Sequence, residues 1–434
     1  MREIKRVAVL GSGVMGGAIA AHLANCGIPS IMLDIVPPNL SEDDRRDKKK
    51  KNAIVDKAKA ALLKTKPSPL FKKSNIDMIE TGNFDDDLHA VADADWIIEV
   101  VREELSIKRA LFERVMQHRR PGSILSTNTS GIPIGEIAEV LPEEARQHFL
   151  GTHFFNPPRY LHLLELIPTP ETSRHVLEDM AAFGENILGK GIVYAKDTPN
   201  FIANRVLTFA MQWTLHEMTK AGLSVEEVDA LTGKNIGHAG SATFRTADLV
   251  GLDTFQHVVA NVYNGCPNDE RRDLMTGPEW FDKMIEKGYY GDKTGSGFYK
   301  ATKDRDEKGK RIILGIDPET VDYRPPVKPR FDCTGKARNA EDLHEKLQIM
   351  HFGEDEGSKF LFRLFANLAQ YAGNRIPEIA DDIVNIDNAC KWGFNWDIGI
   401  FETWDALGFH KVAERMDEEG IALPPVAQAL RESG

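Results

Sequence analysis

The sequence is poor in cysteine and has no long apolar run. Its four cysteines are scattered and form neither a CxxC pattern nor a cluster with histidines. This distribution argues against a zinc site or a disulfide framework, so we expect no bound metal and a reducing compartment. No apolar run approaches the length that would span a bilayer. The first residues run directly into a strand pattern and leave no room for a signal peptide, so we expect a soluble, cytoplasmic protein.

An excess of positive charge is also lacking. The net charge is -12 over 434 residues, and 42% of the residues are hydrophobic. A chain of this charge repels nucleic acid and anionic membrane surfaces as a whole. The length is too great for one hydrophobic core, so we expect two or three globular domains.

The first part of the chain alternates between strand and helix patterns, which predicts an α/β fold of the Rossmann type with a parallel sheet. Long amphipathic helices follow from Phe201 to about Val262, and the alternation does not resume. The boundary is therefore expected near residue 198. The expected strands are Arg6–Leu10, Ile31–Asp34, Ala94–Val101, Ser123–Ser126 and Leu150–Phe155, with a helix at Met15–Asn25.

The remainder predicts a duplicated all-α region. Residues 199–302 form a first helical domain, residues 303–340 are polar and read as a linker or extended segment, and residues 341–434 form a second, degenerate copy. Four pairs of residues recur in order with one residue inserted: Gly237 and Gly393, Phe244 and Phe401, Asp248 and Asp405, Gly251 and Gly408.

A glycine-rich turn follows the first strand. Its pattern is G-x-G-x-x-G, made by Gly11, Ser12, Gly13, Val14, Met15 and Gly16. Such a turn brings backbone N–H groups and a helix N-terminus to a pyrophosphate, although a tight turn without a ligand has the same pattern. Asp34 ends the second strand, where a carboxylate binds ribose hydroxyls and repels a 2'-phosphate. We therefore predict NAD rather than NADP as the cofactor.

The stretch GTHFFNPPRYLHLLELIP at 151–168 predicts a hairpin whose turn contains two prolines. In an antiparallel hairpin centred near Arg159, His153 lies opposite Glu165. A carboxylate there fixes the imidazole tautomer and stabilises its protonated form, as a general base for alcohol oxidation requires. The alternative is a surface histidine and an unrelated glutamate. Because Glu165 is surrounded by leucines and isoleucine, an idle carboxylate would be costly to bury.

Two polar stretches are candidates for the same site. Ser126–Ser130 (STNTS) follows a short strand at the expected carboxyl edge of the sheet, where ligands of such sheets bind, but it also fits a helix N-cap cluster. The stretch from Asp197 to Arg205 opens the first long helix and carries Asn204, which is either a donor to a substrate oxygen or a local hydrogen bonder.

Together these segments resemble the 3-hydroxyacyl-CoA dehydrogenase family over about Lys5–Lys300. The motifs that carry the resemblance are GSGVMG, IIEVV, STNTS, HFFNPPRY, KDTPNFIANR, TADLVGLDT and KTGSGFYK. The resemblance implies NAD-dependent oxidation of an (S)-3-hydroxyacyl-CoA to the 3-ketoacyl-CoA in fatty-acid β-oxidation. It assigns catalysis to His153, Glu165, Ser130 and Asn204. It assigns the cofactor to Gly11, Ser12, Gly13, Val14, Met15, Gly16, Asp34, Glu103, Lys108, Ser130, Asn156 and Lys293.

The chain also departs from the short members of that family. It carries GHAGSATFRTADLVGLD where they have a GPFELxDxVGLD-like stretch, which leaves the acyl-chain preference open. Its second helical copy is similar to the long multifunctional enzymes, without their hydratase domain. The resemblance therefore implies an enoyl-CoA hydratase domain or subunit and a thiolase as partners, and either a fragment or a stand-alone form. The oligomeric state is expected to be a monomer with an internal pseudo-dimer or a homodimer.

Three alternatives stay open. The basic segment 45–73 either attracts the phosphates of CoA or is a solvated helical face. The chain is either a dehydrogenase of 3-hydroxyacyl-CoA thioesters or a Rossmann-type dehydrogenase of free 3-hydroxy acids. The third possibility is a non-enzymatic NAD-binding protein with a structural or sensor role. The presence of His153, Glu165, Asn204 and Ser130 together argues against it, because such a role would not need them.

Overall fold

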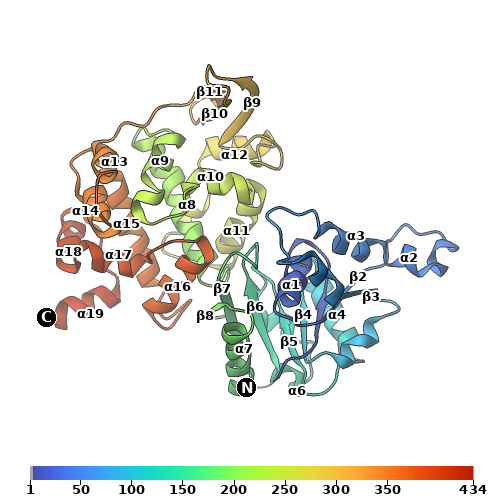
Figure 1. Ribbon diagram of the computed structural model, residues 1–434. Coiled ribbons are helices and arrows are strands. Elements are labelled where there is room, and N and C mark those ends of the chain that lie inside the picture. Colours follow the sequence, from blue (N-terminus) through green and yellow to red (C-terminus); the bar gives the residue numbers. More distant parts are fainter. Residues whose placement is uncertain (1–2, 434) are drawn as a thin grey trace. The chain divides into compact units, whose positions relative to one another are not determined.

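The computed structural model describes residues 3–433 (Figure 1). The chain divides into two compact units, of which the first ends at Phe201 and the second begins at Ile202. We call them the sheet unit and the helical unit. The division falls close to the boundary expected at residue 198. Among the described residues, no helix is both long and apolar enough to cross a membrane.

The sheet unit is built on a sheet whose strand order is β3-β2-β1-β4-β5-β6-β7-β8 within the described residues. The strands from β3 to β6 are parallel, and their order is that of dinucleotide-binding folds, so the predicted Rossmann-type fold is confirmed. The strand β7 is antiparallel to β6. The strands are β1 (Val7–Leu10), β2 (Ser30–Asp34), β3 (Ile79–Asn83), β4 (Trp96–Glu99), β5 (Ile124–Thr127), β6 (Phe149–Phe154), β7 (Leu163–Pro168) and β8 (Gly191–Tyr194).

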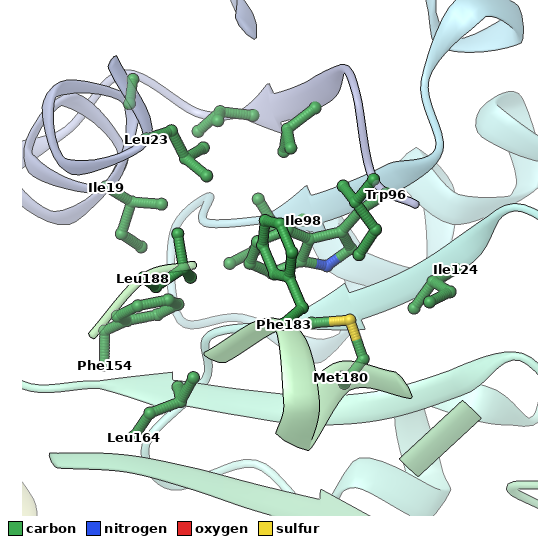
Figure 2. Packing of buried hydrophobic residues seen from close by; sticks show 14 of the residues in the cluster. Ile19, Leu23, Trp96, Ile98, Ile124, Phe154, Leu164, Met180, Phe183 and Leu188 are labelled. Carbon is green, nitrogen blue, oxygen red and sulfur yellow. The ribbon is translucent and has the colours of Figure 1, made fainter. Parts of the chain in front are cut away.

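Helices cover this sheet and bury its apolar side chains. Figure 2 shows the cluster around Trp96 of β4, which packs edge-on against Phe183 with 6.0 Å between ring centroids. Ile19 and Leu23 of the first helix belong to the same cluster. Burial of such side chains is the main favourable contribution to the folding free energy, and it fixes the positions of the strand ends. The helices are α1 (Val14–Asn25), α2 (Lys48–Lys51), α3 (Ala53–Ala61), α4 (Leu105–Met116), α5 (Ile134–Ala138), α6 (Glu143–Arg146) and α7 (Arg174–Asn186).

The helical unit contains two sets of helices joined by a small sheet. The segment expected as a linker or extended segment, residues 303–340, contains the antiparallel strands β10 (Arg311–Asp317) and β11 (Asp322–Arg324) and the end of β9 (Tyr299–Arg305). The first residues of β9 lie in the expected first helical domain. Most side chains of these strands are exposed or half-buried, which explains why the apolar pattern was weak. The helices are α8 (Ala203–Lys220), α9 (Val225–Leu231), α10 (Ala242–Val250), α11 (Leu252–Gly265), α12 (Glu279–Glu286), α13 (Asp332–Ala337), α14 (Leu343–Phe352), α15 (Glu356–Asn374), α16 (Ile383–Phe394), α17 (Ile400–Leu407), α18 (Phe409–Glu418) and α19 (Pro425–Ser433).

The two sets repeat one local geometry. Asp229 accepts hydrogen bonds from the backbone N–H groups of Phe244 and Arg245, at the start of α10. Asp387 does the same at the start of α17, through Phe401 and the residue after it. Burial raises the pKa of Asp229 to about 7 and that of Asp387 to about 6. This shared cap supports the predicted duplication.

The glycine pairs give a mixed result. Gly251 and Gly408 have matching left-handed φ angles of +102° and +92° between successive helices, as a pair should. Gly237 also has a positive φ, but Gly393 lies inside α16, and Asn395 takes the left-handed position there. The pairing of Gly237 with Gly393 is therefore wrong, because the turn that ends α16 uses asparagine instead of glycine.

The second set packs against the first through α15 and α8. The rings of Phe209 and Tyr371 stack with centroids 4.1 Å apart, and Trp213 contacts Phe360 at 5.5 Å. Counted along the repeat, the position that matches Asn204 of the first set falls near Phe360, among the buried apolar side chains of α15. An apolar, buried ring at that position supports a structural role for the second set.

Candidate active site

The glycine-rich turn lies between β1 and the N-terminus of α1. Gly11 has a φ of +114°, and a β-carbon there would lie 2.5 Å from the carbonyl oxygen of Val100. A β-carbon at Gly16 would lie 1.9 Å from the carbonyl oxygen of Gly11. At Gly13, by contrast, a β-carbon would meet no atom within 4 Å. The first and third glycines are required by packing, and the second leaves open space at the helix N-terminus, where a pyrophosphate is predicted to bind.

This difference predicts opposite effects for two alanine substitutions. Gly16→Ala should lower the free energy of unfolding by about 1–3 kcal/mol, because the backbone must move to admit the methyl group. Gly13→Ala should leave stability unchanged and weaken NADH binding on the order of tenfold, the cost of one or two lost hydrogen bonds to phosphate. Thermal unfolding and NADH fluorescence titration measure the two effects. Equal NADH affinity in Gly13→Ala and the parent would contradict the placement of the phosphates.

Asp34 lies at the carboxyl end of β2 beside the same turn. Its Oδ2 atom accepts a 2.7 Å hydrogen bond from the backbone N–H of Ser12 and a second one from the Ser12 hydroxyl. Its Oδ1 atom accepts from the N–H of Ile35 at 2.7 Å. These contacts hold the carboxylate beside the turn, and its binding of ribose hydroxyls stays a prediction.

The hairpin of β6 and β7 has the predicted register. His153 pairs with Glu165 across the two strands, and its Nδ1 atom lies 2.6 Å from Glu165 Oε2. Glu165 is fully buried and His153 is 5% exposed. Because a carboxylate accepts hydrogen bonds, Nδ1 carries a proton and Nε2 keeps the lone pair that accepts one.

Two aromatic rings pack against the imidazole of His153. The ring of Phe155 lies 4.7 Å away and that of Phe201 lies 5.4 Å away, between centroids. The hairpin turn is held in place by Arg159, which donates to the carbonyl oxygens of Ser68 and Leu70. Packing and the hydrogen bond to Glu165 together give His153 a fixed orientation, as a general base needs.

A buried ion-pair network lies at the carboxyl edge of the sheet. The ammonium group of Lys108 is 2.9 Å from Glu99 Oε1 and 3.2 Å from Glu103 Oε2. Lys108 is 1% exposed and Glu99 is fully buried. Lys108 was expected at the cofactor from the family resemblance, whereas Glu99 was not expected to have a role. The signal was present, since a glutamate inside the apolar strand WIIEVV needs a partner.

The two carboxylates of this network respond to it in opposite directions. Burial raises the pKa of Glu99, against the opposing effects of Lys108 and the hydroxyl of Thr127. Burial also acts on Glu103, but the Lys108 charge and the hydrogen bond from Thr129 outweigh it and lower the Glu103 pKa. Glu103 also accepts from the backbone N–H groups of Ser130 and Gly131 at 3.0 Å. The network thereby fixes the loop that carries Ser130.

The residues of the STNTS stretch have different roles. Ser126 accepts buried hydrogen bonds from Trp96 and Thr152, and Thr127 donates to Glu99. Asn128 accepts from the backbone N–H of Phe154, next to His153, at 2.9 Å. These contacts tie the end of β5 to the end of β6. Ser130 follows them as a half-buried residue of the loop.

The other predicted residues are placed as follows. Asn156 is an exposed residue at the start of the hairpin turn. Asp197, at the start of the DTPN stretch, caps α5 through the N–H groups of Ile134 and Gly135. Asn204 lies in the first turn of α8, and Lys293 forms an ion pair with Asp253. Both belong to the helical unit, so their parts in the site stay predictions.

The basic segment is only partly neutralised. Lys48 pairs with Asp87 at 2.9 Å, Lys51 pairs with Asp86, and Lys50 pairs with Asp44. Lys57 and Lys64 are exposed. Attraction of CoA phosphates by the remaining lysines stays a prediction.

The strand order, the open glycine turn and the buried histidine–glutamate pair are those of a Rossmann-type dinucleotide-binding dehydrogenase. Residues 6–198 match the NAD binding domain of 3-hydroxyacyl-CoA dehydrogenase, and residues 201–301 match the C-terminal domain of the same enzyme. The chain belongs to the 3-hydroxyacyl-CoA dehydrogenase family.

Individual relatives agree with this assignment. A probable 3-hydroxyacyl-CoA dehydrogenase of Bacillus subtilis is 45% identical over 439 residues, covering 100% of this chain and 55% of that protein. One of Deinococcus radiodurans is 45% identical over 341 residues, covering 77% of this chain and 95% of that protein. The crystal structure of 3-hydroxybutyryl-CoA dehydrogenase from Escherichia coli K12 shares the fold, with a TM-score of 0.68, 22% identity and 100% coverage of both chains. The chain thus spans about half the length of the Bacillus relative.

Proposed function

We propose that this chain oxidises (S)-3-hydroxyacyl-CoA thioesters to 3-ketoacyl-CoA with NAD, as a step of fatty-acid β-oxidation. The observation that carries the proposal is the buried pair of His153 and Glu165, with 2.6 Å between Nδ1 and Oε2. A base of this kind removes the hydroxyl proton of an alcohol while the hydride leaves the same carbon. The family to which the chain belongs supports the CoA thioester as substrate.

The residues divide the work as follows. Nε2 of His153 takes the hydroxyl proton, and Glu165 stabilises the imidazolium that forms. Ser130 and Asn204 are proposed to donate hydrogen bonds to the substrate oxygen. NAD, when bound at Gly13 and Asp34, supplies the hydride acceptor. The products are the ketone, NADH and one proton on His153, so atoms and electrons balance.

The direct test is the reverse reaction. We expect NADH absorbance to fall when the protein is mixed with NADH and acetoacetyl-CoA, and to stay constant with free acetoacetate. Consumption with the free acid alone would favour a dehydrogenase of free 3-hydroxy acids. Tight NADH binding without turnover of either substrate would favour a sensor. The hydratase and thiolase partners, the oligomeric state and the remaining lysines of the basic segment stay predictions.

Asp34 is proposed to select NAD over NADP. Asp34→Ala should lower the preference for NAD on the order of tenfold, because it removes both a hydrogen-bond acceptor and the charge that repels a 2'-phosphate. Rates with NADH and NADPH at limiting concentrations measure the ratio. A variant with the parent's ratio would remove Asp34 from the ribose site.

A further inference from the structure

The helical unit contains an apolar cavity of about 140 Å³ that the proposed mechanism does not use. It lies between α8 and α10 of the first set and α14, α15 and α17 of the second set. Its wall includes Met211, Leu364, Phe365, Leu368 and Trp396. We call it the tail cavity. An apolar cavity of this kind excludes water and accepts apolar ligands.

The hydroxyl groups in the wall of the tail cavity are already hydrogen-bonded within the protein. Those of Thr214, Thr232 and Thr403 donate to the carbonyl oxygens of the residues four positions earlier. Thr243 donates to Thr232, and Thr246 pairs with Ser241 at 2.7 Å. A ligand therefore has no unsatisfied hydroxyl to bind, and the wall favours a hydrocarbon over a polar group.

The wall also carries no charge to hold a carboxylate or phosphate. It contains two histidines, His238 and His351, and neither is protonated at neutral pH. Burial lowers the pKa of His238 to about 3 and that of His351 to about 4. The ring of His238 stacks on that of Trp396 with centroids 3.7 Å apart. Nδ1 of His351 forms a hydrogen bond with the carbonyl oxygen of Leu347. The charged end of any ligand must stay outside the cavity.

The helix α10 lines the cavity from its opening at the surface inward. Val250 lines the cavity at the end of α10 and is 57% exposed, so the cavity reaches the surface there. Ala242, Thr246 and Ala247 line it along the same helix. In the GPFELxDxVGLD-like stretch of the short family members, the residue matching Thr246 is leucine. A leucine has a bulkier side chain and would project into this space.

We propose that the tail cavity binds the hydrocarbon tail of a long-chain acyl-CoA, while the CoA end and the reacting carbon remain outside it. The identity of the ligand as an acyl-CoA rests on the proposed function. The expectation that the cavity binds a hydrocarbon chain does not depend on that function. Each methylene that leaves water for apolar surroundings contributes about fourfold in affinity. The cavity therefore makes this chain selective for long substrates, which the departure of α10 from the family pattern left open.

The test compares two chain lengths in the parent and in filled-cavity variants. In the parent, kcat/KM for (S)-3-hydroxydodecanoyl-CoA should exceed that for (S)-3-hydroxybutyryl-CoA by at least about a hundredfold, as three or four buried methylenes imply. Thr246→Leu and Ala210→Leu, on two different helices of the wall, should each reduce this ratio at least tenfold. Thr219→Leu, an exposed threonine of α8 outside the cavity, is the matched control and should keep the parent ratio.

A binding measurement separates this inference from the proposed function. Calorimetric titration with dodecanoyl-CoA and butyryl-CoA needs no turnover and should show the same ratio and the same loss in the two variants. If neither 3-hydroxyacyl-CoA is turned over, but dodecanoyl-CoA binds more tightly than butyryl-CoA and the two variants lose this difference, the proposed function is wrong and the binding of the tail in the cavity is supported. If the enzyme is active and both filled-cavity variants, folded by thermal unfolding, keep the parent ratio, the tail binds elsewhere and the inference is wrong.

Discussion

Replacing His153 with alanine is expected to lower the rate of acetoacetyl-CoA reduction by at least about a hundredfold, the usual contribution of a general acid or base. In this direction His153 gives its proton to the forming alkoxide, so its loss slows the same transition state. NADH affinity should barely change, because His153 is not among the residues that are proposed to hold the cofactor. Stopped-flow absorbance gives the rate, and fluorescence titration gives the affinity.

Two further variants decide how this loss is interpreted. His162→Ala removes an exposed histidine that precedes β7 and should keep the parent rate. Glu165→Gln should slow the reaction less than His153→Ala. The double variant should be no slower than His153→Ala alone, because Glu165 acts only through the imidazole. Parent-like turnover in His153→Ala would end the mechanism, and additive losses would give Glu165 a separate role.

The hairpin shows which part of the site local sequence determines. The proline-containing turn fixes the register, and the register brings residues 153 and 165 together, so this pair was predictable without knowledge of the rest of the sheet. The glycine turn was predictable for the same reason, since all of its residues are neighbours in the chain. That packing requires Gly11 depends on Val100, far away in the sequence, so only the structure shows it. The structure also shows that a β-carbon at Gly13 would meet no atom within 4 Å.

The features that the sequence did not reveal depend on contacts or exposure that a local pattern does not show. Glu99 lies on β4, and its hydrogen-bond partner Thr127 lies on β5, so their contact depends on strand order rather than on local pattern. Residues 303–340 were expected as a linker or extended segment, and their strands were not identified, because half-exposed strands bury too few side chains to give an alternating apolar pattern. The repeat was recognised in the sequence, but its caps Asp229 and Asp387 were not, because they bond backbone groups of the following helix.

The second large effect concerns stability. Lys108→Met should lower the free energy of unfolding at neutral pH by about 3–5 kcal/mol, because it leaves the fully buried Glu99 carboxylate without its cation. Urea unfolding curves at several pH values measure the loss. The neighbouring Arg109→Met is the matched control, since its pair with Glu139 is solvent-exposed and contributes at most about 1 kcal/mol.

The pH dependence identifies Glu99 as the cause. Its pKa in the folded protein is raised, so the folded state favours the protonated carboxyl, and the associated stability is present at acid pH and lost as pH rises through the raised pKa. Lys108 opposes that shift, so the Lys108→Met deficit should be smallest below the ordinary glutamate range and grow toward neutral pH. Adding Glu99→Gln should recover most of it. A deficit that is independent of pH and persists with Glu99→Gln would mean that Lys108 stabilises the fold through packing alone.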